Sequence, residues 1–289
     1  MSQVAFIGAG NIGAPMARTL LRGQLKVKVC DFSDKVRHEF EELGCETAVN
    51  ASAVATSWAV VIMVNTAEQL MDTLFGPNGL TAGLQDDIRP LVIVTSTILP
   101  SIIEGVAKKL AGFGIRMIDA PVSGGPIPAA EGRLTIMVGG DPTDIELAYP
   151  ILNLLGNRVV ICGAIAAGQK TKIINNLVGV TNQLIMGEAL ELGAGCGLDP
   201  ACLLSVMDSS SGRNFWSRDW DLTRRQYAEY AQVADENLYV ERSIKDLDLA
   251  RHFADAMHID MPLLGIVADA AGKMQDSEIA RRFRSFSQF

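Results

Sequence analysis

Three polar residues recur along one predicted helix at the spacing of a single face. Lys172, Asn175 and Asn176 stand at positions i, i+3 and i+4, so all three side chains can project from the same side. A lysine amine placed in a cleft can exchange a proton with a reacting group. Apolar residues crowd the same turns, which favours a position near a buried cleft, whereas polar residues on a helix usually form a solvated surface. The spacing leaves both interpretations open.

A second group of residues contributes backbone rather than side chains. Gly8, Gly10 and Gly13 form a GxGxxG pattern between a short apolar run and a predicted helix. The first glycine permits a tight turn, the second lets the backbone approach a pyrophosphate, and the third lets helix and strand pack closely. The start of the helix offers unpaired N–H groups to the phosphates. The pattern predicts a dinucleotide site, although such glycine turns also occur for purely structural reasons.

The next predicted strand ends at Asp31. A carboxylate at this point would accept hydrogen bonds from the adenosine ribose hydroxyls and would repel a 2'-phosphate. Phe32 follows, where an NADP site often has an arginine. NAD is therefore favoured over NADP, and the alternative is that Asp31 is a solvated residue at a strand end.

The elements that must position these residues follow from the apolar pattern. Predicted strands cover residues 3–7, 26–30, 59–64, 91–95, 115–118, 134–138 and 158–161. Several are continuously apolar, as strands covered on both faces are, and helix-length segments separate the early ones. This alternation predicts an α/β fold with an N-terminal Rossmann domain, built on a doubly wound, mostly parallel sheet.

The pattern changes after Gly163. One long helix is predicted from Gly168 to about Leu192, and no strand is predicted beyond it. We therefore expect a cofactor-binding domain over residues 1–163, a long interdomain helix, and an all-α substrate and oligomerisation domain over residues 164–289. The apolar surface of the long helix predicts a homodimer or homotetramer.

Composition excludes several classes of protein. The 289 residues carry a formal net charge of −8 with scattered basic residues, which argues against a nucleic-acid partner. The five cysteines and three histidines show no metal-site spacing, so no metal is expected and the cysteines are interpreted as reduced core thiols. No apolar run reaches the roughly 18 residues of a membrane span and no targeting segment is recognised, which predicts a cytoplasmic protein.

Four sequence blocks resemble those of the β-hydroxyacid dehydrogenase family, which contains 3-hydroxyisobutyrate dehydrogenase and tartronate semialdehyde reductase. The blocks are GAGNIGAPMARTL (8–20), DAPVSGGPIPAAEGRLTIMVGG (119–140), GQKTKIINN (168–176) and KDLDLA (245–250). They stand in the family's order and extend across nearly the whole chain. Two departures, Ala166 in place of a frequent glycine and Ile12 in place of a frequent methionine, remove no charge and no donor.

The resemblance implies a role for each block. Lys172 would be the catalytic residue, Asn176 would position the substrate, and the loop of Ser123, Gly124 and Gly125 would bind it. The loop follows a strand, where glycine N–H groups and a hydroxyl can hold a small carboxylate. The residues implied in cofactor binding are Gly8, Gly10, Asn11, Ile12, Gly13, Asp31, Val64, Asn65, Thr97 and Lys245.

Two cations carry open alternatives. Ser243 and Asp246 have the spacing of a capping box, which predicts a helix start at Ser243 and places Lys245 in its first turn, against the helix dipole. Lys245 would then either reach the nicotinamide end of the cofactor, as the resemblance implies, or be an exposed lysine screened by nearby aspartates. Arg213 could pair a second carboxylate or a phosphate of the substrate, or be a surface arginine.

The expected reaction is the reversible oxidation of a short 3-hydroxy acid to its semialdehyde or keto acid with NAD. Lys172 would act as general base, which requires its pKa to fall from about 10.4 through burial or a nearby cation. The alternatives are an NADPH-dependent semialdehyde or imine reductase of the same fold, and a catalytically silent NAD-binding regulatory protein. The latter would be expected to lack at least one of Lys172, Asn176 and Ser123, and all three are present.

Overall fold

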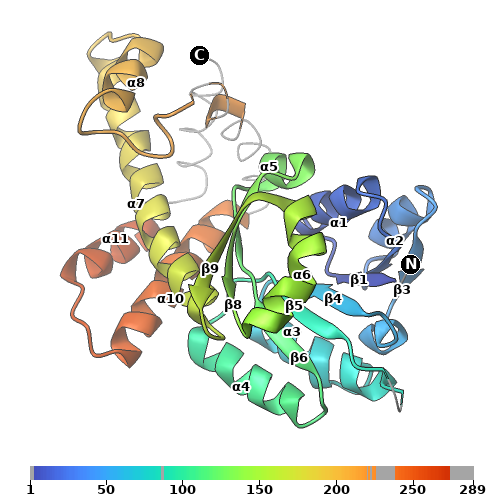
Figure 1. The fold of residues 1–289 in the computed structure, drawn as a ribbon. Coiled ribbons are helices and arrows are strands. Elements are labelled where there is room, and N and C mark those ends of the chain that lie inside the picture. The colour runs from blue at the N-terminus through green and yellow to red at the C-terminus, as the bar shows by residue number, and fades with distance from the viewer. Residues whose placement is uncertain (1–2, 86–87, 220, 222, 226–237, 274–289) are drawn as a thin grey trace. The chain divides into compact units, whose positions relative to one another are not determined.

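The chain forms two compact units, Met1–Lys172 and Ile173–Phe289, hereafter unit 1 and unit 2 (Figure 1). This computed structural model describes residues 3–85, 88–219, 221, 223–225 and 238–273. The boundary between the two units lies after Lys172, nine residues later than the domain boundary that the sequence predicts after residue 163. The reason is that the start of helix α7 (Ala167–Gly195) is hydrogen-bonded to Asp119, a strand residue of unit 1.

Unit 1 is built on a nine-stranded sheet in the order β3-β2-β1-β4-β5-β6-β8-β7, with β9 pairing β8. The strands are β1 (Val4–Ile7), β2 (Val27–Cys30), β3 (Glu46–Ala48), β4 (Ala59–Ile62), β5 (Leu91–Val94), β6 (Arg116–Asp119), β7 (Val122–Ser123), β8 (Leu134–Gly139) and β9 (Gly156–Gly163). Strands β1 to β6 are mutually parallel, β8 runs antiparallel to β6 and β7, and β9 is parallel to β8. All seven predicted strands are present, whereas β3 and β7 are too short to give a periodic signal.

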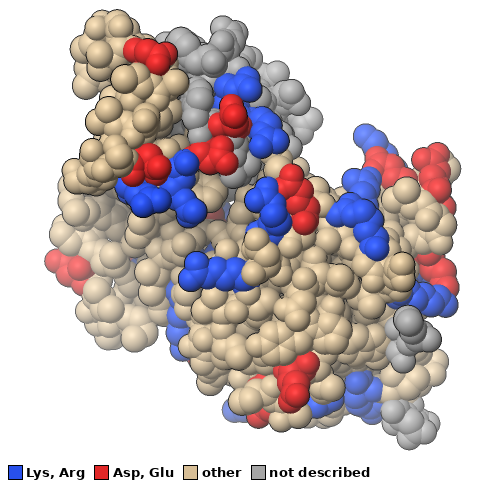
Figure 2. Space-filling view, turned by 45° about the horizontal axis from the view of Figure 1, so that its top comes forward, with Lys and Arg blue, Asp and Glu red and all other residues tan. Residues whose placement is uncertain are grey.

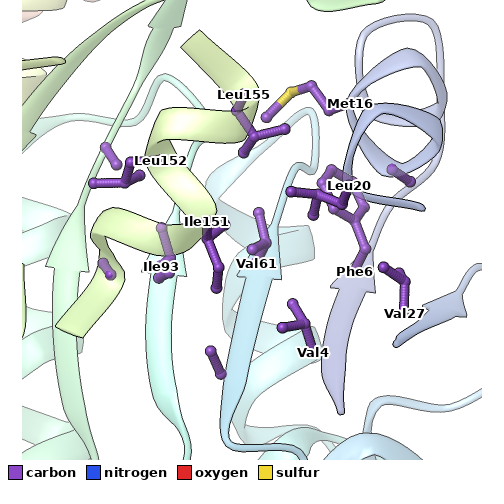
Figure 3. Packing of buried hydrophobic residues seen from close by; sticks show 14 of the residues in the cluster. Val4, Phe6, Met16, Leu20, Val27, Val61, Ile93, Ile151, Leu152 and Leu155 are labelled. Atoms are coloured by element: carbon purple, nitrogen blue, oxygen red, sulfur yellow. The ribbon is translucent and has the colours of Figure 1, made fainter. Parts of the chain in front are cut away.

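Both faces of this sheet are covered, which explains its continuously apolar strands. Val4 and Phe6 of β1 pack on one face with Ile151 and Leu155 of α6, as Figure 3 shows. Ala5 and other strand residues of alternate parity pack on the opposite face against α3 and α4. Successive strand side chains point to opposite sides, so each strand contributes to two separate cores.

The helices of unit 1 connect these strands. They are α1 (Gly13–Arg22), α2 (Asp34–Glu41), α3 (Ala67–Phe75), α4 (Pro100–Ala111), α5 (Pro126–Glu131) and α6 (Pro142–Leu155), with short 3₁₀ turns at Ala51–Val54 and Leu80–Gly83. Helices α1 and α6 pack on the face shown in Figure 3, and α3 and α4 on the other. The predicted doubly wound Rossmann architecture is confirmed.

The regular elements of unit 2 are all helices in the part of the chain that the structure describes. It contains most of α7, then α8 (Pro200–Asp208), α10 (Leu238–Ala256) and α11 (Pro262–Lys273). Its core joins Ile173 of α7 to Leu247 and Ala250 of α10 and to Leu264 and Ala271 of α11. The predicted long helix and the all-α C-terminal region are confirmed.

Two local predictions are wrong. Helix α10 is already formed at Leu238, so Ser243 is not its N-cap and Lys245 lies in the helix interior, without the predicted dipole cost. Nothing in residues 238–242 breaks a helix, and a serine with an acid three residues on is a weak start signal. The cysteines are all free, but Cys196 and Cys202 are exposed and are not core residues.

Charged residues of both signs share the face that Figure 2 presents. Figure 2 shows Lys and Arg interspersed with Asp and Glu on the face it presents, with wide uncharged areas between them. Among the described residues, no helix is both long and apolar enough to cross a bilayer. The described part of the chain also has no group of three or more His, Cys, Asp or Glu side chains that could hold a metal ion.

Candidate cofactor and substrate site

The glycine loop between β1 and α1 distinguishes its three glycines. Gly8 has a φ of +88°, and a Cβ there would overlap the carbonyl oxygen of Met63. A Cβ on Gly13 would overlap the carbonyl oxygen of Gly8. Gly10 has a negative φ, and a Cβ there would meet no atom within 4 Å. The fold therefore requires Gly8 and Gly13, whereas Gly10 keeps open space beside the loop, as a pyrophosphate needs.

The start of α1 is suited to an anion. Ile12 is the N-cap residue and supplies no side-chain hydrogen bond, and the first turn contains no acidic residue. The preceding Asn11 and Gly10 are exposed. Helix N-terminal N–H groups and the helix dipole favour negative charge at such a position, so the loop fits the phosphates of a dinucleotide.

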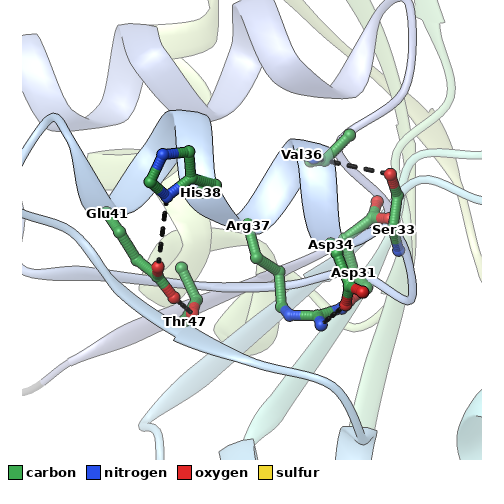
Figure 4. A network of polar contacts seen from close by, with 8 residues as sticks. All are labelled: Asp31, Ser33, Asp34, Val36, Arg37, His38, Glu41 and Thr47. Atoms are coloured by element: carbon green, nitrogen blue, oxygen red, sulfur yellow. Dashed lines mark hydrogen bonds and ion pairs between the residues drawn. The ribbon is translucent and has the colours of Figure 1, made fainter.

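Asp31 is tied to the same loop. Its Oδ2 accepts a hydrogen bond from the backbone N–H of Ala9 at 2.8 Å, and its Oδ1 accepts one from the N–H of Ser33 at 2.9 Å. Arg37 donates to the backbone carbonyl of Asp31 at 2.7 Å and pairs with Asp34, as Figure 4 shows. The carboxylate is therefore a buried part of the loop and not a solvated residue at a strand end.

The end of β4 lies beside that of β1 in the sheet, and the end of β5 lies next to that of β4. Ser96 Oγ accepts a hydrogen bond from the N–H of Val64 at 2.8 Å, which joins the two loops, and Gln69 Oε1 accepts one from the N–H of Asn65. Thr97 is half-buried in the loop after β5. The order of strands reverses between β1 and β4, and open α/β sheets bind ligands at this switch point.

The predicted substrate loop follows β6. Ser123 is half-buried and pairs with Thr135 in the register of β7 and β8. Gly124 and Gly125 have φ values of +144° and +84°, which L residues with side chains rarely adopt. The two glycines therefore present backbone without a Cβ, at the same edge of the sheet as the cofactor residues.

The three polar residues predicted on one face of α7 differ in burial. Lys172 is only 8% exposed, Asn176 is half-buried and Asn175 is exposed. Asn176 Nδ2 donates to Asp246 Oδ2 of α10 at 2.8 Å. Lys172 is therefore buried and the Asn176 amide is held by Asp246, while the catalytic and substrate roles of these two residues stay predictions.

The two remaining cations lie in unit 2. Lys245 is half-buried on α10, next to Asp246. Arg213 is exposed, and its Nε lies 3.2 Å from Asp208 Oδ1 in an ion pair. In the same segment Trp216 is buried and its indole N–H donates to the carbonyl of Gly179 on α7. The pairing of Arg213 is that of a surface arginine, and its role toward substrate stays a prediction.

One polar group at this sheet edge was not singled out by the sequence. Asp119, at the end of β6, is fully buried and accepts hydrogen bonds from the N–H groups of Ala166 and Gln169, at 2.6 and 2.8 Å. Burial raises its pKa to about 6, against the opposing effect of these hydrogen bonds. The available signal was an aspartate at a strand end immediately before the substrate loop, the same signal that identified Asp31.

Family models cover nearly all of the chain. The NAD binding domain of 6-phosphogluconate dehydrogenase matches residues 3–163, and the NAD-binding domain of NADP-dependent 3-hydroxyisobutyrate dehydrogenase matches residues 166–282. The chain is 36% identical over 269 residues to 3-hydroxyisobutyrate dehydrogenase of Pseudomonas aeruginosa, covering 91% of this chain and 89% of that protein. The chain belongs to the β-hydroxyacid dehydrogenase family. As a member of this family, it contains an NAD(P)-binding domain.

Other β-hydroxyacid dehydrogenases match less completely. The mitochondrial 3-hydroxyisobutyrate dehydrogenase of Mus musculus is 36% identical over 75% of this chain, and the chain spans only 64% of that protein's length. L-threonate dehydrogenase of Cupriavidus necator is 33% identical over 86% of this chain and 84% of its own length. The relatives therefore include dehydrogenases named for different hydroxy acids.

Solved structures confirm the fold. 3-Hydroxyisobutyrate dehydrogenase of Mycobacterium tuberculosis, in a structure with L-serine, has a TM-score of 0.77 at 27% identity and covers 99% of both chains. Psf3 in complex with NADP⁺ and 2-OPP has a TM-score of 0.82 at 25% identity, over 98% of this chain and 99% of its own. An imine reductase of Streptomyces aurantiacus, 15% identical with a TM-score of 0.65 over 98% of both chains, shares the fold alone.

Proposed function

We propose that this protein is an NAD-dependent dehydrogenase that reversibly oxidises a short 3-hydroxy acid to its semialdehyde or keto acid. The observation that carries the proposal is the burial of Lys172 on a helix whose first turn is bonded to the sheet edge that bears the glycine and substrate loops. The names of the relatives support the substrate class, since they include dehydrogenases of 3-hydroxyisobutyrate and L-threonate.

NAD is the proposed cofactor in preference to NADP. The residues that would hold it are the glycine loop, Asn11 and Ile12, with Val64, Asn65 and Thr97 on the neighbouring strand ends. Asp31 places a buried carboxylate against this loop, and Arg37 is already engaged by Asp34 and by the carbonyl of Asp31. A 2'-phosphate would thus be repelled by the Asp31 carboxylate, and the Arg37 guanidinium, which could pair with it, is already engaged.

The chain's own groups would orient the substrate. Ser123 and the N–H groups of Gly124 and Gly125 would hold its carboxylate. The bond from Asn176 to Asp246 fixes the plane of the Asn176 amide, which would bind the substrate hydroxyl. Lys245 would act at the nicotinamide end of the cofactor, and Arg213 at a second anionic group of the substrate, if it leaves Asp208.

The proton is the part of the reaction assigned to the protein. When bound, the nicotinamide supplies the hydride chemistry at the carbinol carbon. Lys172 Nζ would take the proton of the substrate hydroxyl during oxidation and return it to the forming alkoxide during reduction. The Lys172 side chain is buried, and a base at this position requires the neutral form of the amine.

A homodimer is the proposed assembly, with a tetramer as the larger alternative. The α7 side chains Ile174, Val178, Ile185 and Leu192 are each more than half exposed. Their spacing of four or seven residues aligns them along one face of the helix. An apolar face of this kind suits a second copy of the chain. We propose the cytoplasm as the location, with which five free thiols are compatible.

The test is a substrate panel read by the absorbance of reduced nicotinamide. Purified protein is mixed with NAD or NADP and with 3-hydroxyisobutyrate, glycerate, L-serine, threonate, 3-hydroxypropionate, 4-hydroxybutyrate or 2-(hydroxymethyl)glutarate. We expect NAD-dependent oxidation of at least one acid and a smaller rate with NADP. Tight NAD binding with no turnover across the panel would contradict the proposed reaction and leave only the nucleotide site.

A further inference from the structure

We propose that Asp119 and Gln169 are positioning residues: together they fix the first turn of α7, and with it the Lys172 amine, to the strand ends that carry Thr97 and Ser123. This inference rests on the proposed function, because it concerns the placement of the proposed catalytic amine. Neither residue is required to touch the substrate. Both are fully buried, and all the bonds described below lie within unit 1.

Asp119 caps a helix to which it is not adjacent in sequence. Ala166 precedes α7 and its carbonyl accepts the helical hydrogen bond from Lys170 N–H. Asp119 Oδ1 accepts from the N–H of Ala166 and Oδ2 accepts from the N–H of Gln169. The N–H groups of the first turn have no partner within the helix, so one carboxylate satisfies two groups that would otherwise be buried and unpaired.

Two glycines make room for this carboxylate. A Cβ on Gly139 of β8 would lie 2.5 Å from Asp119 Oδ1, and a Cβ on Gly168 of α7 would lie 2.7 Å from Oδ2. The same Cβ on Gly168 would also overlap the carbonyl oxygen of Met137. The close approach of helix and strand at Asp119 is therefore built into both elements.

Gln169 extends the same connection to β5. Its Oε1 accepts from the N–H of Ile98 at 3.0 Å, and its Nε2 donates to the carbonyl of Ser96 at 2.8 Å. Both bonds flank Thr97, and Ser96 Oγ in turn accepts from Val64 N–H. A continuous set of hydrogen bonds thus runs from the ends of β4 and β5 through Gln169 to the first turn of α7.

Lys172 follows Gln169 by three residues, within one helical turn, so the placement of its amine depends on how this turn is held. Ser123 follows Asp119 by four residues along the same chain segment. One carboxylate is therefore connected to both the proposed base and the proposed substrate loop. A shift of the turn would misplace the base while leaving the nucleotide loop at β1 in position.

The charge of Asp119 matters to this function. A protonated carboxyl loses acceptor capacity, so one of its two N–H partners would lose a charge-assisted hydrogen bond. The carboxyl is fully buried, and burial raises its pKa to about 6. Lys170 of α7 acts in the opposite direction, and its ammonium pairs with Glu104 of α4 at 3.1 Å. Protonation near pH 6 should therefore loosen the turn.

The experiment compares Asp119→Asn and Gln169→Met with the wild type and with Asp141→Asn. Asp141 is a matched control, because it is a capping carboxylate of unit 1 that serves α6 through Thr143 N–H and not α7. Turnover is measured in the reduction direction, where Lys172 acts as an acid. Its titration then gives the alkaline limb of the pH profile and leaves the acid limb to Asp119.

For the two variants at α7 we expect kcat to fall about 10- to 100-fold, with KM and the Kd of NADH within about twofold. The wild-type acid limb near pH 6 should be absent in Asp119→Asn. Hydrogen exchange without cofactor should be faster for the amides of residues 166–170 in Asp119→Asn and unchanged in Asp141→Asn.

Unchanged kcat in both α7 variants, or a lower kcat with unchanged exchange and an unchanged acid limb, would overturn the proposal. If Asp119→Asn does not fold, Gln169→Met carries the kinetic and exchange tests. A wild-type protein without turnover would refute the proposed function instead, and the exchange comparison would still decide whether Asp119 holds the turn.

Discussion

The two units position their site residues by different means. In unit 1 the cofactor and substrate loops are held by backbone geometry, with positive φ at Gly8, Gly124 and Gly125 and strand ends aligned by the parallel register. In unit 2 the residues assigned to the substrate, such as Asn176, are side chains on helix faces, and a hydrogen bond to Asp246 holds the Asn176 amide. Changes at the loop glycines of unit 1 should therefore affect nucleotide binding, and changes at the Asn176 side chain of unit 2 should affect turnover.

The largest effect on structure is expected at the third glycine of the loop. Gly13→Ala places a Cβ against the carbonyl of Gly8 and should lower the free energy of unfolding by roughly 3 kcal/mol, with loss of NAD binding. Gly10→Ala is the matched variant, because its Cβ meets no atom within 4 Å. It should change stability by less than about 0.5 kcal/mol yet weaken NAD binding at least about tenfold.

Thermal unfolding and NAD titration of both glycine variants measure these effects. An equal loss of stability in Gly13→Ala and Gly10→Ala would refute the claim that the fold requires Gly13 and only cofactor binding requires Gly10. Full NAD affinity in Gly10→Ala would show that the pyrophosphate does not pass over this glycine.

A change of free energy with pH is expected from Asp119. Its folded-state pKa of about 6 lies above the ordinary aspartate value of 3.8, so the folded protein binds the proton first as the pH falls. The contribution of this group to stability is therefore fully present below pH 3.8 and is lost as the pH rises through about 6.

Relative to Asp119→Asn, the wild type should gain roughly 2 kcal/mol of unfolding free energy between pH 7 and pH 4. Chemical denaturation across this range measures the difference. A difference that stays constant with pH would contradict the raised pKa. Activity in the reduction direction should change in the opposite sense, since protonation loosens the turn that carries Lys172.

The cofactor preference should respond to Asp31. Asp31→Asn replaces one of two carboxylate acceptors by a donor facing an N–H group. We expect kcat/KM with NAD to fall about 10- to 100-fold, the cost of one or two charge-assisted hydrogen bonds, and kcat/KM with NADP to fall less. Asp34→Asn removes a neighbouring carboxylate that only pairs with Arg37. If Asp31→Asn leaves the ratio of kcat/KM with NAD to kcat/KM with NADP unchanged, Asp31 does not set the cofactor preference.

The smallest effect is expected at Ala166. This residue has a φ of +71° and is fully buried, so Ala166→Gly relieves backbone strain but removes a packed methyl group. The two terms oppose each other, and the unfolding free energy should change by less than about 1 kcal/mol. A loss of several kcal/mol in denaturant unfolding would show that the Ala166 methyl group, and not the Asp119 bond, holds the start of α7.

The features that could be predicted from the sequence are those that depend on apolar periodicity or on the conformational freedom of glycine. The seven longer strands, helix α7 and the roles of Gly8 and Gly13 follow from patterns that have one steric solution. The sequence did not show the Asp119–Gln169 connection, since its donors are backbone N–H groups 47 and 50 residues away in the chain. The start of α10 was misplaced because a capping box is a local signal, whereas the helix continues wherever no residue interrupts it.

The central claim is that the amine of Lys172 transfers the proton in oxidation of a 3-hydroxy acid. The variant Lys172→Ala tests it most directly, with Lys170→Ala as the control. Lys170 stands two residues earlier on α7 and pairs with Glu104. With the best acid of the panel, and at a pH of about 8 where Asp119 is ionised, Lys172→Ala should lower kcat about 10²- to 10⁴-fold with NAD affinity unchanged, and Lys170→Ala should stay within about threefold of the wild type. Equal turnover in Lys172→Ala and the wild type would contradict the account.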